Sequence, residues 1–175
     1  MKKLTLTLAS ICPSRLRFRG GGFGFGYGGC FFAERLYNRG MKKENYEKIV
    51  EYWRVTAERD FDTMQTLFKM KRYPESLFWG HLLLEKVLKG LAAREIKGHP
   101  PYTHNLLKLA KLSNIDFSEE EVKFFGEIND FNIRARYPEF KLQFHKICNS
   151  AYAAKFIKEI NKAYKKLCQE LKPKK

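Results

Sequence analysis

Residues 74–91 decide the fold of this chain: the stretch Pro74-Glu-Ser-Leu-Phe-Trp-Gly-His-Leu-Leu-Leu-Glu-Lys-Val-Leu-Lys-Gly-Leu91 is apolar on several sides when it is wound into a helix. A helix that is apolar nearly all round must be covered by other elements, so we expect it at the centre of the fold. Proline suits the first turn of a helix, and this helix is predicted to run from residue 74 to about residue 95. Gly80 and Gly90 lower helix propensity, and we interpret them as positions where neighbouring helices approach closely.

Helices are also predicted on both sides of this central stretch. Apolar residues recur at three- and four-residue steps between Tyr46 and Phe68, a pattern typical of one long amphipathic helix. A loop over residues 97–102 contains two prolines and a glycine, and it ends the central helix. Thr103 can cap a short third helix after that loop.

The C-terminal third of the chain predicts two further helices. Ser118 and Glu121 have the spacing of a capping box, which indicates the start of a fourth helix. Apolar residues from Ile147 to Leu171 then mark a long final helix. Because no strand pattern of useful length occurs, the chain is predicted to be all-α, an antiparallel up-and-down bundle of four main helices plus one short helix.

Residues 1–40 differ in character from the rest of the chain. They contain the tract Gly20-Gly-Gly-Phe-Gly-Phe-Gly-Tyr-Gly-Gly29, a composition that loses too much backbone entropy to fold by itself. Regular sequence begins abruptly at Met41, so residues 1–40 are interpreted as a spurious upstream extension or as a disordered tail. The helical domain is accordingly expected to span residues 41–175.

The composition of the chain suggests an anionic partner and a cytoplasmic location. A net charge of +15 over 175 residues favours a nucleotide, RNA or an acidic protein, although lysine-rich helix faces that are simply solvated give the same balance. The four cysteines show no metal-ligand spacing, which is typical of reduced thiols in a cytosolic protein. No apolar run is long enough for a membrane helix, and neither a metal nor another cofactor is expected.

A polar corner comes after the predicted fourth helix, in the sequence Asn132-Ile-Arg-Ala-Arg-Tyr-Pro138. The proline ends the helix and leaves Asn132, Arg134, Arg136 and Tyr137 at its end. Guanidinium groups suit a phosphate, and a tyrosine can stack on a base. These four residues form the candidate binding site, with the alternative that the corner is structural and that Arg136 caps helix carbonyls.

Several phrases together, in this order and spacing, resemble the HEPN domain family. They are Trp53 with Ala57 and Asp60, Tyr73-Pro-Glu-Ser-Leu-Phe78, Leu84-Glu-Lys-Val-Leu-Lys89, Thr103-His104 with Leu106 and Leu109, and Ala135-Arg-Tyr-Pro138. The resemblance covers about residues 44–171 and implies a small prokaryotic bundle that forms a homodimer. Some members are RNases or toxins, and others bind a minimal nucleotidyltransferase encoded beside them.

The resemblance also places Lys86 and Lys89 near the groove of the bundle, where they and His104 are candidates for nucleotide phosphates. Two simpler interpretations remain open: an i,i+4 helix pair between Glu85 and Lys89, and a hydrogen bond from His104 to a neighbouring helix. We expect all three to share one groove with Arg134, Arg136 and Tyr137.

RNase members of the family carry an Arg, then four to six residues, then a His. Here His145 lies nine residues after Arg136 and eleven after Arg134, so the motif is absent and no catalytic residue is predicted. The sequence therefore favours a non-enzymatic protein that binds nucleotide or RNA phosphates and partners a nucleotidyltransferase, as in a toxin–antitoxin module. The alternatives are an RNase toxin with a rearranged Arg/His site and a structural dimerisation module.

Overall fold

The computed structural model describes residues 43–171, and the expectation for residues 1–40 lies outside them. Those residues form six helices and no strand, which confirms the all-α prediction. The helices are α2 (Lys43–Lys69), α3 (Tyr73–Ile96), α4 (Leu106–Leu112), α5 (Glu119–Arg134), α6 (Pro138–Ile147) and α7 (Ser150–Leu171).

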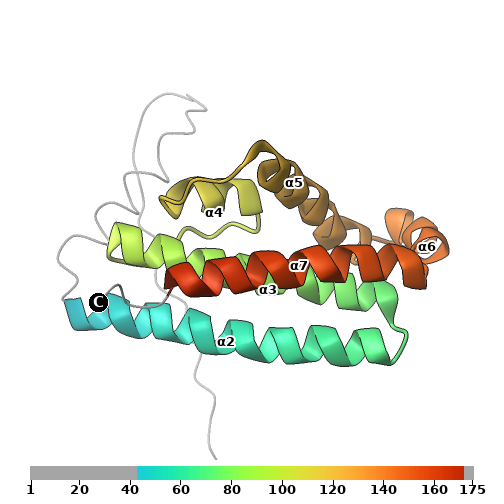
Figure 1. Cartoon of the computed structure of the whole chain (residues 1–175), viewed down its shortest axis with the longest axis horizontal. Helices are drawn as coiled ribbons and strands as arrows, with labels where there is room; N and C mark the ends of the chain where they lie inside the picture. The colour runs from blue at the N-terminus through green and yellow to red at the C-terminus, as the bar shows by residue number, and fades with distance from the viewer. Residues whose placement is uncertain (1–42, 172–175) are drawn as a thin grey trace, which may run out of the picture.

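Helix α3 is the central helix, as its sequence predicts. It packs against α2, α7, α4 and α5, and α4 and α5 cover it on the side away from α2 (Figure 1). Its fully buried large aliphatic side chains are Leu77, Leu83, Leu84, Val87, Leu88 and Leu91. Helix α2 runs antiparallel to α3, whereas α7 runs in the same direction as α3, as alternate helices of an up-and-down bundle do (Figure 1).

The two glycines of α3 lie where other helices approach closely, as predicted. A Cβ atom at Gly80 would lie 2.6 Å from Cδ1 of Ile160 on α7, and one at Gly90 would lie 3.3 Å from Cδ1 of Leu171. The absence of a side chain at these positions therefore lets α7 lie directly against α3.

The helix starts are partly as predicted. Ser118 and Glu121 form the expected capping box: the Ser118 side chain accepts a hydrogen bond from the Glu121 amide, and the Glu121 carboxylate accepts one from the Ser118 amide. The prediction of Thr103 as the cap of α4 is wrong. Asn105 caps this helix by accepting a bond from the Lys108 amide at 3.2 Å, and its neighbour Leu106 donates to Asn129 on α5 at 2.9 Å.

The C-terminal region contains a short helix, α6, that the sequence pattern did not separate from the final helix. Helix α6 ends at Ile147, and α7 begins only at Ser150, because Cys148 leaves the helical conformation and the Asn149 side chain accepts a hydrogen bond from the Tyr152 amide at 2.9 Å. Cys148 is consequently not in the same helix as Cys168. It is buried between helices, and this burial raises the pKa of its thiol to about 12.

Within the described residues, no helix combines the length and apolar character needed to cross a membrane.

Candidate functional site

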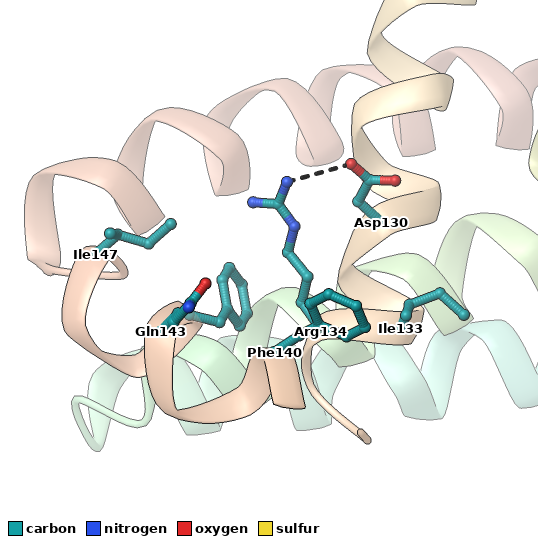
Figure 2. Close-up of a pocket in the computed structure, with 7 residues that line it drawn as sticks. Asp130, Ile133, Arg134, Phe140, Gln143 and Ile147 are labelled. Carbon is teal, nitrogen blue, oxygen red and sulfur yellow. Dashed lines mark hydrogen bonds and ion pairs between the residues drawn. The ribbon is translucent and has the colours of Figure 1, made fainter. Parts of the chain in front are cut away.

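A pocket of about 380 Å³ opens between the end of α5 and helix α6. Its lining consists of Asp130, Ile133, Arg134, Phe140, Gln143, Phe144 and Ile147. Figure 2 shows that the Arg134 side chain extends from α5 toward the space that Gln143 and Ile147 border from α6. Of the seven residues predicted for the site, this pocket contains Arg134 alone.

The local sequence explains why the chain turns here. Pro138 lies in the first turn of α6, and Tyr137 before it has the extended conformation that a following proline favours, with φ of −89° and ψ of 128°. The reversed chain brings Phe144 of α6 onto Phe131 of α5, with ring centroids 5.5 Å apart and an interplanar angle of 27°. Phe144 is only 1% exposed, so this stacking fixes one wall of the pocket to the core.

The two arginines of the corner have different partners. Arg136 donates a hydrogen bond from Nε to the carbonyl of Asn132 at 2.9 Å, and its guanidinium lies 6.0 Å from the centre of the Tyr137 ring. Among the described residues, the Arg134 side chain donates a hydrogen bond to Asp130, with 3.4 Å between Nη2 and Oδ2, and both side chains are exposed. That distance is long for a charge-assisted hydrogen bond, which is usually about 2.7–2.9 Å. Arg136 thus fastens the end of α5, and Arg134 keeps hydrogen-bonding capacity for a ligand.

Asn132 and Tyr137 do not join Arg134 in the pocket lining. Asn132 is buried, so its side chain is not presented to solvent, and its carbonyl holds Arg136. Tyr137 is about half exposed beside Arg136.

A second polar group is centred on Glu85, inside the bundle. Glu85 is 4% exposed and accepts a hydrogen bond from Lys89 at 2.8 Å. Nδ1 of His104 lies 3.0 Å from the same carboxylate, and Nε2 of the fully buried His81 lies 3.3 Å from it. Beside this group, Nζ of Lys86 forms an ion pair of 2.6 Å with Asp60 of α2.

Burial and contacts with basic side chains shift the pKa values of Glu85 and Asp60 in opposite directions. Burial alone raises the pKa of Glu85, but its contacts with His81, Lys89 and His104 outweigh this effect and lower the pKa to about 2. For Asp60 the balance is reversed: burial raises the pKa more than the contact with Lys86 lowers it. The Glu85 carboxylate is therefore ionised in the folded protein, and it already binds the side chains of Lys89 and His104.

The α5–α6 pocket does not bring all the predicted site residues together. The pocket at the α5–α6 corner contains none of Lys86, Lys89 and His104. The reason is electrostatic: Lys86 pairs with Asp60 on α2, and Lys89 pairs with Glu85 and lies 5.0 Å from the ring of Trp53, also on α2. Asp60 therefore holds Lys86 toward α2, whereas Lys89 is held by Glu85, one turn earlier on α3.

His145 is exposed on α6 and does not line the Arg134 pocket. It lies close enough to Glu75, at the start of α3, to assist Arg72 in lowering the pKa of that carboxyl.

Sequence reasoning missed the α6 side of the pocket. Phe140, Phe144 and Ile147 recur at four- and three-residue steps directly after Pro138, which is the spacing of one helix face. This spacing is a local signal of a helix that begins at Pro138, and Gln143 falls on the same face of that helix.

Comparison with known proteins agrees with the fold and with the resemblance found in the sequence. The family model described as HEPN domain matches residues 50–171. The crystal structure of TT1696 from Thermus thermophilus is similar, with a TM-score of 0.59 and 18% sequence identity over 70% of this chain and 98% of that chain. A comparison with curated proteins gives no significant match. Since the family model covers most of its length, the chain belongs to the HEPN domain family.

Proposed function

We propose that this chain is a HEPN protein without RNase activity that binds the phosphates of a nucleotide or of RNA and associates with a nucleotidyltransferase. One observation carries the binding proposal: Arg136 is bonded to the end of α5, while the guanidinium of Arg134 lines an open pocket with one long contact to an exposed carboxylate. A guanidinium with donors to spare is suited to phosphate oxygens.

The absence of RNA cleavage is inferred from acid–base chemistry. Cleavage of RNA by family members uses a His as acid or base beside an Arg, and within the described residues no His lines the Arg134 pocket. A positioned general acid or base typically contributes a factor of about 10² to 10⁴ to the rate. Without one at this pocket, the chain is a binding protein rather than a nuclease.

The association with a nucleotidyltransferase rests on family membership, because some HEPN members bind such an enzyme. The neighbouring gene is the direct test of this part of the proposal. An adjacent nucleotidyltransferase whose product co-purifies with this chain supports it, and an isolated gene argues against it.

The binding proposal predicts that Arg134→Ala and Arg136→Ala have different effects. Arg134→Ala should weaken binding of ATP and of a short RNA by roughly tenfold or more, since a hydrogen bond to a charged group contributes about 1.5–3 kcal/mol. Arg136→Ala should mainly lower the melting temperature, because it removes a bond to the end of α5. Calorimetry and thermal melts of the wild type and both variants measure these effects, and binding should fall as salt is added.

Two results would contradict the proposal. If both variants bind as tightly as the wild type, the corner is structural. If the RNA is cut during the titration and His145→Ala abolishes the cutting, the chain is an RNase toxin with a rearranged site.

A further inference from the structure

We infer that the α5–α6 pocket holds the nucleobase of a bound nucleotide, stacked on Phe140, with the phosphates at Arg134. This inference rests on the proposed function and adds to it the part of the ligand that occupies the pocket. The volume of about 380 Å³ lies within the range of about 300–1,000 Å³ that is usual for small-ligand sites.

The apolar walls of the pocket suit a flat aromatic ligand. Phe144 forms a rigid wall, because it is buried and stacked on Phe131. Phe140 also lines the pocket but is 49% exposed, so part of its ring has no cover. Ile147, in the last turn of α6, completes the apolar side. An uncovered aromatic ring beside a guanidinium is the combination that proteins use for a base and its phosphate.

The polar groups of the pocket match the edges of such a ligand. Gln143 carries an amide, which offers both a donor and an acceptor to the edge of a base. Asp130 lies on the α5 side, where it holds the guanidinium of Arg134 at 3.4 Å (Figure 2). A ligand that consists only of phosphates would bind Arg134 but would make no stacking contact with Phe140 and would not need the amide of Gln143.

The test compares a ligand that has a base with one that has only phosphates. Calorimetry of the full chain with ATP and with inorganic tripolyphosphate should give tighter binding of ATP, although tripolyphosphate is the more highly charged ligand. Phe140→Leu keeps an apolar side chain but removes the ring, and it should weaken ATP binding by about tenfold without changing tripolyphosphate binding. Arg134→Gln should weaken both.

Leu142→Ala is the matched control, because Leu142 is an exposed apolar residue of the same helix that does not line the pocket. It should leave the affinity for both ligands unchanged. Since Phe140 and Leu142 are both exposed, the Phe140→Leu and Leu142→Ala variants should have melting temperatures close to that of the wild type. A short RNA in a parallel titration shows whether a nucleotide within a strand uses the same pocket, in which case Phe140→Leu weakens its binding too.

Failure of this inference is distinguishable from failure of the proposed function. If ATP and tripolyphosphate bind with equal affinity, and Phe140→Leu binds ATP as tightly as the wild type, the pocket does not hold the base. The proposed phosphate site at Arg134 is then unaffected. No binding of either ligand overturns both. A change of oligomeric state in Phe140→Leu at unchanged ATP affinity assigns the ring to a protein interface and also overturns the inference.

Discussion

Glu85 is the residue on which the polar contacts inside the bundle converge. Lys89 is its i,i+4 neighbour on α3, His81 lies one turn before it, and His104 comes from the loop before α4. The carboxylate therefore joins that loop to the central helix. A buried carboxylate needs partners of opposite charge or hydrogen-bond donors. If the carboxylate is removed, the buried partner charge has no counter-ion, which destabilises the folded protein.

At neutral pH, Glu85→Gln should destabilise the protein by roughly 3 kcal/mol, mostly because Lys89 is left as a buried charge without its counter-ion. Urea denaturation at pH 7 measures this change. The double variant Glu85→Gln/Lys89→Met should recover much of the loss, because it removes both charges. Glu51→Gln is the control, as Glu51 is exposed on α2 and its ion pair with Arg54 should contribute less than about 1 kcal/mol. A Glu85→Gln variant as stable as the wild type would show that the network contributes nothing to stability.

The lowered pKa of Glu85 predicts a loss of stability in acid. Its pKa is about 2 in the folded protein against an ordinary value of 4.5, so the stabilisation is complete above about pH 4.5 and is lost as the pH falls toward 2. The shift corresponds to roughly 3 kcal/mol. The difference in unfolding free energy between wild type and Glu85→Gln should therefore shrink across this window. A difference that stays constant from pH 5 to pH 2 would show that the carboxylate is not held ionised.

At the scale of the element, the contact between α3 and α7 depends on the missing side chain at Gly80. A Cβ atom there would meet Cδ1 of the buried Ile160 at 2.6 Å and Sδ of Met64 at 3.2 Å. Alanine would gain helix propensity, but the two helices and α2 would have to move or repack. Overpacking of a core usually costs about 1–3 kcal/mol, which exceeds the gain of about 0.5–1 kcal/mol in propensity.

We expect Gly80→Ala to destabilise the protein by about 1 kcal/mol, and the addition of Ile160→Val to relieve part of the clash by removing Cδ1. Gly126→Ala is the matched control on α5, since a Cβ atom there has nothing within 4 Å. It should be neutral or stabilise by up to about 1 kcal/mol. Chemical denaturation of the three variants decides between the effects. If Gly80→Ala is as stable as Gly126→Ala, the close approach of α7 does not require a glycine.

At the scale of the whole molecule, the described surface keeps several large apolar side chains in contact with solvent. Around the α5–α6 corner, Leu142 is 75% exposed, and Phe140, Tyr137, Ile133 and Ile147 are each about half exposed. An apolar cluster on a small bundle marks a site of interaction with a ligand or another protein chain. Two copies related by a two-fold axis can cover such surfaces mutually.

We therefore predict a homodimer at micromolar concentration. Light scattering should give a mass close to twice the 20.7 kDa of the single chain, and dilution should shift the population toward the monomer. The measurement itself needs no ligand. Because Phe140, Ile133 and Ile147 also line the α5–α6 pocket, repeating it with saturating ATP shows whether a bound nucleotide and a second copy compete for these residues. A single species of monomer mass at all concentrations would contradict the prediction.

The elements that can be predicted from sequence alone are those that depend on local spacing. The all-round apolar character of residues 74–91 was enough to identify α3 as central, and Ser118 and Glu121 were enough to locate the start of α5, because caps and helix faces are set by neighbours three and four residues apart. The same holds for the pair of Glu85 and Lys89. The break between α6 and α7 is not visible in the sequence pattern, because the apolar periodicity continues across it.

Only the tertiary structure decided what each polar side chain of the candidate site contacts. His104 meets Glu85 across 19 residues of sequence, and Lys86 meets Asp60 on another helix. Both contacts depend on how the helices pack, so no spacing within one helix predicts them. The same is true of the corner: the two arginines are nearly equivalent in sequence, yet the folded chain directs Arg136 to a helix carbonyl and Arg134 to an open pocket. Tertiary packing separates them because the turn at Pro138 brings α6 against the face of α5 that carries Arg134.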